Sequence, residues 1–373
     1  METGRLEDKL IFGGDSKRWP YMVVSTIIKI LINIKTLYMI QLPIPSHFQP
    51  DRVGEIWRVH YQQRSIEAKA WAQQYQLRSK SQSQTQVELL LIDVQNTFCL
   101  PDFELFVGGQ SGRGAIEDNV RLAEFIYRNL GEIDQIVATM DTHHLHQIFH
   151  PAFWIDREGN HPTPAVTTIE PADVESGKWR ANPEFGDENV EQLQAYALHY
   201  VQQLSEGGKY PLLIWPYHAM LGGIGHALVP AVEEAIFFHG IARNSQASFS
   251  IKGDRTLTEN YSALAPEVFT NQFGETIASK NDALIRHLLA ADKLIIAGQA
   301  QSHCVAWTVS DLLDEINAID PKLAHKVYLL ADCTSPVVIP GIVDYTAQAD
   351  VAYQRFAEAG MNIVKSTDDR IFL

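Results

Sequence analysis

A cysteine stands where a reactive thiol would be positioned in an α/β protein. Cys304 follows the apolar run at residues 293–297 and begins a pattern typical of a helix. Backbone N–H groups at such a strand-to-helix turn stabilise a thiolate relative to a thiol. Taken alone, a cysteine in an apolar setting is more often a buried, unreactive side chain. The hypothesis of a nucleophile therefore needs support from elsewhere in the chain.

Two charged side chains follow other apolar runs in the same way. Asp93 ends the run that begins at Val87, and Lys252 follows the run at residues 247–251. Singly, an aspartate or a lysine after a strand is more often a cap or a solvated surface group. The carboxyl ends of parallel strands, however, meet at one edge of a sheet, where open α/β folds bind ligands. We therefore expect Asp93, Lys252 and Cys304 to converge there.

A second group of side chains has the composition of a metal site. Asp141 and His143 form an Asp-x-His turn after another apolar run, and His218 lies far away in the chain. Carboxylate and imidazole are ligands that suit zinc and other divalent transition metals. The loop after His143 holds three more histidines, at positions 144, 146 and 150, which could add a ligand or form polar surface.

Five sequence blocks together resemble the isochorismatase-like cysteine hydrolase superfamily, and within it they are most similar to the nicotinamidases. The resemblance extends from about Val87 to the C-terminus. Its blocks are Leu91–Phe98, Asp141–His143, Trp215–His218, Lys252 and Gly298–Val305.

The resemblance implies a role for each group of the predicted thiol apparatus. Asp93 would take the proton of the Cys304 thiol, Lys252 would lower the pKa of that thiol, and Cys304 would form a thioester with the substrate. The oxyanion donors would be the backbone N–H groups of Ala300 and Cys304, next to a cis peptide between Gln299 and Ala300.

The resemblance also implies one divalent metal ion, zinc or iron, that holds the ring nitrogen of the substrate. Its ligands would be Asp141, His143 and His218, with His150 as the candidate fourth ligand. Metal-free relatives keep the thiol apparatus without these residues, so their presence favours an amidase. Phe98 is the candidate wall of a pocket for a flat ring, while Phe153 and Trp154 are left open.

Departures from the family pattern leave the substrate open. Tyr217, Ala219 and Gly223 stand where the nicotinamidase blocks have other residues. We expect hydrolysis of nicotinamide or a related small amide to the acid and ammonia. The alternatives are a cysteine hydrolase acting on a ureido, carbamoyl or isochorismate-like compound, and a catalytically silent binding protein.

The composition is that of a folded acidic protein. Hydrophobic residues make up 46% of the 373 residues, and 30 Lys and Arg face 45 Asp and Glu, for a formal charge of -15. A nucleic-acid binder needs clustered basic surface, which the sequence lacks. Three widely spaced cysteines favour a reducing, cytoplasmic setting over a disulfide framework. We expect a small-molecule substrate and a homo-oligomer.

The N-terminal part is predicted to be an extension. We divide the chain into an extension and linker at 1–86 and a catalytic domain at 87–373, with an insertion at about 156–188. Tyr21–Ile40 is apolar but contains Lys29 and Lys35, so we do not expect it to span a membrane. An alternative hypothesis is that translation starts naturally at Met39.

Apolar runs alternate with helical patterns after residue 86, which predicts an α/β three-layer sandwich around a six-stranded, mainly parallel sheet. The superfamily resemblance implies the same Rossmann-like fold. The predicted strands are 87–93, 133–140, 211–215, 247–251, 293–297 and 326–331. The predicted helices are 62–76, 116–129, 190–204, 226–239, 282–290, 304–316 and 342–359.

Overall fold

A computed structural model describes residues 41–185, 189–207, 210–368 and 371–372. Leu42–Leu373 form one compact unit. The hypotheses about the apolar run at 21–40 and about Met39 fall outside the described residues. Within the described part, no helix is both long enough and apolar enough to cross a membrane.

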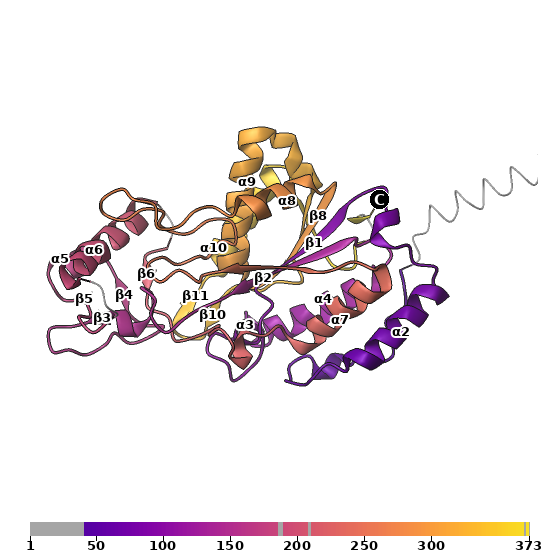
Figure 1. Ribbon diagram of the computed structural model, residues 1–373, viewed down its shortest axis with the longest axis horizontal. Helices are drawn as coiled ribbons and strands as arrows, with labels where there is room; N and C mark the ends of the chain where they lie inside the picture. Colours follow the sequence, from indigo (N-terminus) through magenta and orange to yellow (C-terminus); the bar gives the residue numbers. More distant parts are fainter. Residues whose placement is uncertain (1–40, 186–188, 208–209, 369–370, 373) are drawn as a thin grey trace, which may run out of the picture. The chain divides into compact units, whose positions relative to one another are not determined.

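The centre of the compact unit is a six-stranded parallel sheet in the order β12-β9-β8-β1-β2-β7 (Figure 1). The predicted fold class is thus confirmed. The strands of this sheet are β1 (Val87–Ile92), β2 (Gln135–Asp141), β7 (Ser248–Lys252), β8 (Lys293–Gly298), β9 (Val327–Leu330) and β12 (Asn362–Val364).

Both faces of the sheet are covered by helices, which explains why the central strands are continuous apolar runs. All six residues of β1 are buried. One apolar cluster joins the sheet to α4 (Gly114–Arg128) and α7 (Pro230–Arg243). A second joins it to α8 (Asp282–Ala290), α9 (Ala306–Ile319) and α10 (Thr346–Glu358). Figure 1 shows these two layers on opposite sides of the sheet.

One predicted strand was wrong. The run at 211–215 does not enter the central sheet: its core, β6 (Leu212–Leu213), pairs antiparallel with β4 (Thr168–Ile169). The sixth strand is β12, which has only three residues and lies at the sheet edge. A strand this short has no apolar run that could reveal it.

The predicted helices exist; the bounds predicted for 282–290 are those of α8, and the other helices have shifted ends. The helix predicted at 226–239 is α7, which begins at Pro230 because proline fits the first turn of a helix, where its missing N–H is not needed. The helix predicted to begin at Cys304 is preceded by a π-helical turn, η5 (Gln301–Val305), which contains that cysteine.

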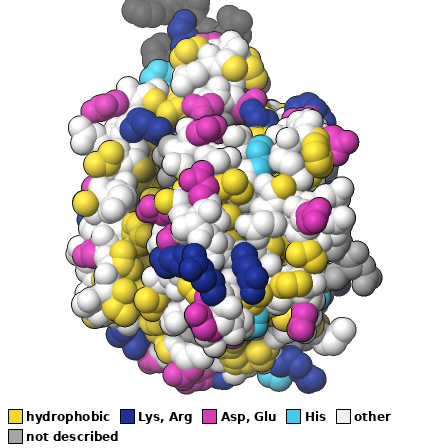
Figure 2. Space-filling model, turned by 90° about the vertical axis from the view of Figure 1, so that its left-hand side faces the viewer, with side chains coloured by type: hydrophobic (Ala, Val, Ile, Leu, Met, Phe, Trp, Pro, Cys, Tyr) yellow, Lys and Arg dark blue, Asp and Glu magenta, His cyan; other side chains and the backbone are white. Residues whose placement is uncertain are grey.

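The segment at 156–188 packs with the helix that follows it. Among its described residues are β4, α5 (Pro171–Glu175) and β5 (Arg180–Ala181), which pairs with β3 (Trp154–Ile155). These elements and α6 (Val190–Gly207) share a third apolar cluster with Phe153 and Trp154. On the face of the molecule at this end, Figure 2 shows small groups of Lys and Arg side chains between acidic and apolar ones.

The chain before β1 also packs on the unit. Helix α2 (Tyr61–Gln74) lies against α7, and the buried Arg64 Nε donates to Glu234 Oε1 at 2.6 Å. The division after residue 86 remains a prediction. The other short elements are η1 (Pro50–Arg52), η2 (Lys80–Gln82), α3 (Asn96–Cys99), η3 (Pro151–Phe153), η4 (Ile224–His226), η6 (Pro321–Lys326), β10 (Val338–Ile339) and β11 (Val343–Asp344).

Candidate active site

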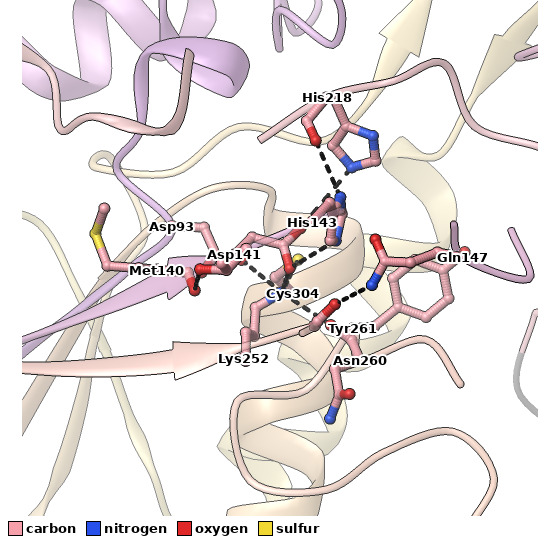
Figure 3. A network of polar contacts seen from close by, with 12 residues as sticks. Asp93, Met140, Asp141, His143, Gln147, His218, Lys252, Asn260, Tyr261 and Cys304 are labelled. Atoms are coloured by element: carbon pink, nitrogen blue, oxygen red, sulfur yellow. Dashed lines mark hydrogen bonds and ion pairs between the residues drawn. The ribbon is translucent and has the colours of Figure 1, made fainter. Parts of the chain in front are cut away.

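The carboxyl ends of β1 and β7 and the turn after β8 bring the three predicted catalytic side chains together (Figure 3). The Lys252 ammonium lies 3.0 Å from Asp93 Oδ2 and 3.6 Å from Cys304 Sγ. The expected convergence of these three heads is therefore present, and all three side chains are buried.

Asp93 is held by its own strand end and by a neighbouring strand. Its φ of 48° is in the left-handed region, which non-glycine residues seldom adopt. Thr139 of β2 compensates by accepting from Asp93 N at 3.0 Å and donating to Asp93 Oδ1 at 2.6 Å. These contacts leave Oδ2 directed toward Lys252.

The protonation of the three groups is coupled. Burial raises the pKa of Asp93, although the charge of Lys252 works in the opposite direction. Burial likewise raises the pKa of the Cys304 thiol well above its ordinary value, again opposed by Lys252. The pKa of Lys252 is raised because the charges of Asp141 and Asp93 outweigh its burial. A proton shared between a buried carboxyl and a buried thiol, beside a permanent cation, suits proton transfer during attack.

Asp141 connects this group to the predicted metal site. Its Oδ1 lies 2.9 Å from Lys252 Nζ and 3.1 Å from His143 Nε2, and its Oδ2 lies 3.8 Å from His218 Nε2. Burial alone would raise the pKa of Asp141, but the neighbouring charges, His143 first and Lys252 next, lower it below its ordinary value. The carboxylate is therefore ionised, as a metal ligand must be.

Three histidines form a cluster whose geometry fits a metal ion. Ligand atoms of His143, His150 and His218 all lie within 4.8 Å of one another. Each Nδ1 is hydrogen-bonded to a backbone carbonyl: that of His218 for His143 (3.1 Å), Leu145 for His150 (3.3 Å) and Pro216 for His218 (2.7 Å). This pattern directs the Nε2 of each ring into the cluster, where His143 Nε2 faces Asp141 and His150 Nε2 has no partner among the described residues.

His150, the candidate fourth ligand, gives the clearest test of this fit. Its Nε2 is buried and, among the described residues, has no hydrogen-bond partner. Burial, with a contribution from His143, lowers the pKa of His150 to about 4, and burial also lowers the pKa of His218 well below its ordinary value. Neutral imidazoles with an unused nitrogen are suited to bind a metal. The donor set of Asp141 and three histidines thus fits zinc or a similar ion.

Two residues that shape the site were not singled out from the sequence. Gly253 has φ +77°, and a Cβ there would lie 2.5 Å from Asp141 Oδ1. Gln95, fully buried, accepts from Asp141 N at 2.7 Å and donates to Asp141 O at 2.8 Å. Its primary amide continues the β1–β2 pairing beyond the last backbone partners and fixes Asp141. The Lys-Gly pair at 252–253 was the available signal for the glycine.

A cavity of about 290 Å³ opens beside these groups. Cys304, Asp141, His143 and His218 line it together with Phe98, the predicted aromatic wall. Phe153 and Trp154, whose role was left open, instead belong to the apolar cluster of the insertion. The volume is near the lower end of the range for ligand pockets, so the cavity suits a small substrate. Further lining residues are Phe103, Phe106, Ala165, Trp215, Glu259, Tyr261 and His303.

The backbone around the nucleophile has the predicted form. The Gln299–Ala300 peptide is cis, and Ala300 lines the cavity together with Cys304. The participation of their N–H groups in an oxyanion hole remains a prediction.

Comparisons with known proteins returned matches among solved structures. No protein-family model and no curated protein matches the chain. The matching structures include an Acinetobacter baumanii nicotinamidase-pyrazinamidase (20% identity, 77% of this chain and 99% of that chain, TM-score 0.45). They also include the yeast nicotinamidase bound to nicotinaldehyde (19% identity, 75% of this chain and 99% of that chain, TM-score 0.45). A third match is a zinc complex of Pyrococcus horikoshii pyrazinamidase (17% identity, 75% of this chain and 99% of that chain, TM-score 0.40).

These enzymes are of the kind that the sequence blocks resemble. With identities of 17–20% and TM-scores of 0.40–0.45, we draw no conclusion about activity from the matches. The functional argument therefore rests on the geometry of the site.

Proposed function

We propose that the protein is a metal-containing cysteine amidohydrolase that converts nicotinamide, or a related small amide, to the carboxylic acid and ammonia. The observation that carries this proposal is the convergence of Asp93 and Lys252 with Cys304, which lines a small cavity. A thiol with a proton acceptor and a cation within contact distance is the apparatus of thiol-dependent acyl transfer.

In the proposed reaction, Cys304 Sγ attacks the carbonyl carbon of the amide while its proton moves to Asp93. Both groups have pKa values raised by burial, so the transfer accompanies attack and needs no preformed thiolate. Lys252 stabilises the negative charge, which is on the Asp93 carboxylate before proton transfer and on the Cys304 sulfur as the proton leaves it. Asp93 returns the proton to the nitrogen, the C–N bond breaks, and ammonia leaves a thioester. Asp93 then takes a proton from water, which cleaves the thioester and restores the thiol.

Asp141, His143, His150 and His218 would hold the metal ion. When bound, a divalent ion supplies a Lewis acid that coordinates a ring nitrogen and thereby orients the substrate. Phe98, whose ring centroid lies 5.7 Å from that of His218, would pack against the face of the ring. The proposed role of these residues is therefore orientation of the carboxamide toward the nucleophile.

The experiment is ammonia release from nicotinamide and benzamide by metal-loaded protein. Benzamide has the same carboxamide and nearly the same shape, but no ring nitrogen. We expect nicotinamide to be cleaved at least roughly 100-fold better in kcat/KM, as when a polar site meets an apolar isostere.

The other outcomes separate the metal role from the thiol chemistry. Equal rates on both amides would remove the metal from substrate recognition. Inactivity on both, with rapid cleavage of a ureido compound, would exclude nicotinamide as the substrate but keep the cysteine mechanism. Inactivity on every amide and ureido compound tested would favour a binding protein.

A further inference from the structure

Glu259 is a buried carboxyl in the wall of the catalytic cavity that the proposed reaction does not use. Its residue surface is 6% exposed, and it lines the same cavity as Cys304 and Ala300. The next residue, Asn260, accepts a hydrogen bond from Lys252 Nζ through its backbone carbonyl at 2.8 Å. The segment that contains Glu259 is therefore tied to Lys252 through Asn260 (Figure 3).

Two aromatic residues of the cavity wall hold the Glu259 carboxyl. Tyr261 interacts with this carboxyl, and Trp215 Nε1 donates to the Tyr261 hydroxyl at 3.1 Å. All three residues line the cavity. Glu259 therefore lies at the cavity surface with two polar aromatic residues that line the same cavity.

The ionisation state of Glu259 also suits the binding of an uncharged amide. Burial, with the nearby charge of Glu267 as the second cause, raises the pKa of Glu259 well above its ordinary value. A protonated carboxyl retains a carbonyl oxygen that accepts hydrogen bonds. It can therefore bind an N–H group without leaving an unpaired negative charge in the cavity.

The arrangement of the site fixes where the nitrogen of a bound amide would point. In the proposed reaction the oxyanion faces the N–H groups of Ala300 and Cys304, and the ring faces the side chains that would hold the metal. The remaining substituent of the carbonyl carbon is the NH2 group. Glu259 and Asn260 line the cavity beside Lys252, so this side offers an acceptor to the NH2 group.

We propose that the Glu259 carboxyl accepts a hydrogen bond from the NH2 group of the substrate and so makes the enzyme select primary amides over esters of the same acid. This inference rests on the amidohydrolase function proposed above. An ester has an oxygen and no N–H at the same position, so it cannot make this contact. A lost partner for a buried polar group penalises the wrong substrate.

The experiment compares kcat/KM for nicotinamide and for methyl nicotinate in three metal-loaded proteins: wild type, Glu259→Leu and Glu259→Gln. In Glu259→Leu we expect the amide-to-ester ratio to fall by roughly 10- to 100-fold, through the amide alone. In Glu259→Gln the side-chain carbonyl remains, so the ratio should stay within about 3-fold of wild type. Glu315→Gln is the control: Glu315 pairs with Lys280 and lies outside the cavity lining, so its ratio should not change.

A purely structural role for Glu259 would give a different result. Such a role would lower both activities together, and an unchanged ratio in Glu259→Leu would overturn the proposal. A ratio that collapses in Glu259→Gln would do the same. Should Glu259→Leu not fold, as judged by thermal unfolding, Glu259→Ala replaces it with the same expectation. Wild-type protein that cleaves neither substrate would instead refute the proposed function, and the inference with it.

Discussion

Lys252 is the residue whose removal should disturb the site most, because it is a buried cation between two carboxylates. Its Nζ lies 2.9 Å from Asp141 Oδ1 and 3.0 Å from Asp93 Oδ2. At an effective dielectric constant of about 20, each contact corresponds to roughly 5–6 kcal/mol of attraction, which is offset by the cost of burying the charges. Breaking a buried pair by removing one partner costs about 3–5 kcal/mol. We therefore expect Lys252→Met to lower Tm by roughly 4–7 °C.

The pH dependence of this loss separates electrostatics from packing. Burial already raises the pKa of Asp93, and removal of Lys252 should raise it further. A carboxyl with a raised pKa in the folded state contributes stability at low pH and loses that contribution as pH rises through the folded value. The Tm difference between wild type and Lys252→Met should therefore be small near pH 5 and widen toward pH 8, and the variant should be inactive.

The assay is thermal unfolding followed by circular dichroism between pH 5 and pH 8, with both proteins loaded with the same metal. Lys280→Met is the matched control, because Lys280 forms an exposed pair with Glu315 at 2.6 Å. Exposed pairs contribute about 0–1 kcal/mol, so this variant should stay within roughly 2–3 °C of wild type at every pH. Equal losses in the two variants, or a gap for Lys252→Met that does not widen with pH, would refute the reasoning.

Four further outcomes follow from the structure. Cys304→Ala should abolish ammonia release with Tm nearly unchanged, while Cys333→Ala, at another buried thiol, should keep turnover; turnover by Cys304→Ala would end the thioester hypothesis. His218→Ala should lower bound metal in elemental analysis, and full occupancy would contradict its assignment as a ligand. Gly253→Ala, with φ +77° and a Cβ in contact with the metal-site carboxylate, should lower metal content and activity together; a fully loaded, active variant would show that the close approach relaxes. Burial raises the pKa of Glu88 to about 7, so its stabilising effect is lost as pH rises from about 4.5 to 7. Glu88→Gln should therefore reduce the loss of unfolding free energy between pH 4 and pH 8 by up to roughly 3 kcal/mol, and an unchanged loss would exclude Glu88 as its source.

The clearest strand signals in the sequence belong to strands that are buried on both faces. β1 and β8 read as continuous apolar runs because helices cover both sides of them. The run at 211–215 has the same composition, yet its strand pairs with the insertion, because apolar character reports burial and not the partner. β12 was missed for the opposite reason: its three residues include a partly exposed Ile363 at the sheet edge. Local pattern therefore predicted the layers better than the pairing.

The predicted site residues shared a simple signal: a polar side chain directly after a buried strand. Asp93 and Lys252 were found in this way, because parallel strands place their carboxyl ends at one edge. Gln95 and Glu259 lacked that signal. Gln95 acts on the backbone of Asp141, 46 residues away, and Glu259 reaches the cavity from a loop without regular structure. Contacts of this kind depend on tertiary packing, which spacing along the chain does not encode.

The geometry around Lys252 explains why the thiol and the metal side chains act as one site. An ammonium has three N–H donors, yet four acceptors surround it: Asn260 O at 2.8 Å, Asp141 at 2.9 Å, Asp93 at 3.0 Å and Cys304 Sγ at 3.6 Å. The sulfur is the most distant, so the two carboxylates compete with it for the charge of the lysine. A change that weakens the contact between Asp141 and Lys252 would leave more of the lysine charge to stabilise the Cys304 thiolate. In the proposed mechanism, the side chains of the metal site would thus also set the reactivity of Cys304.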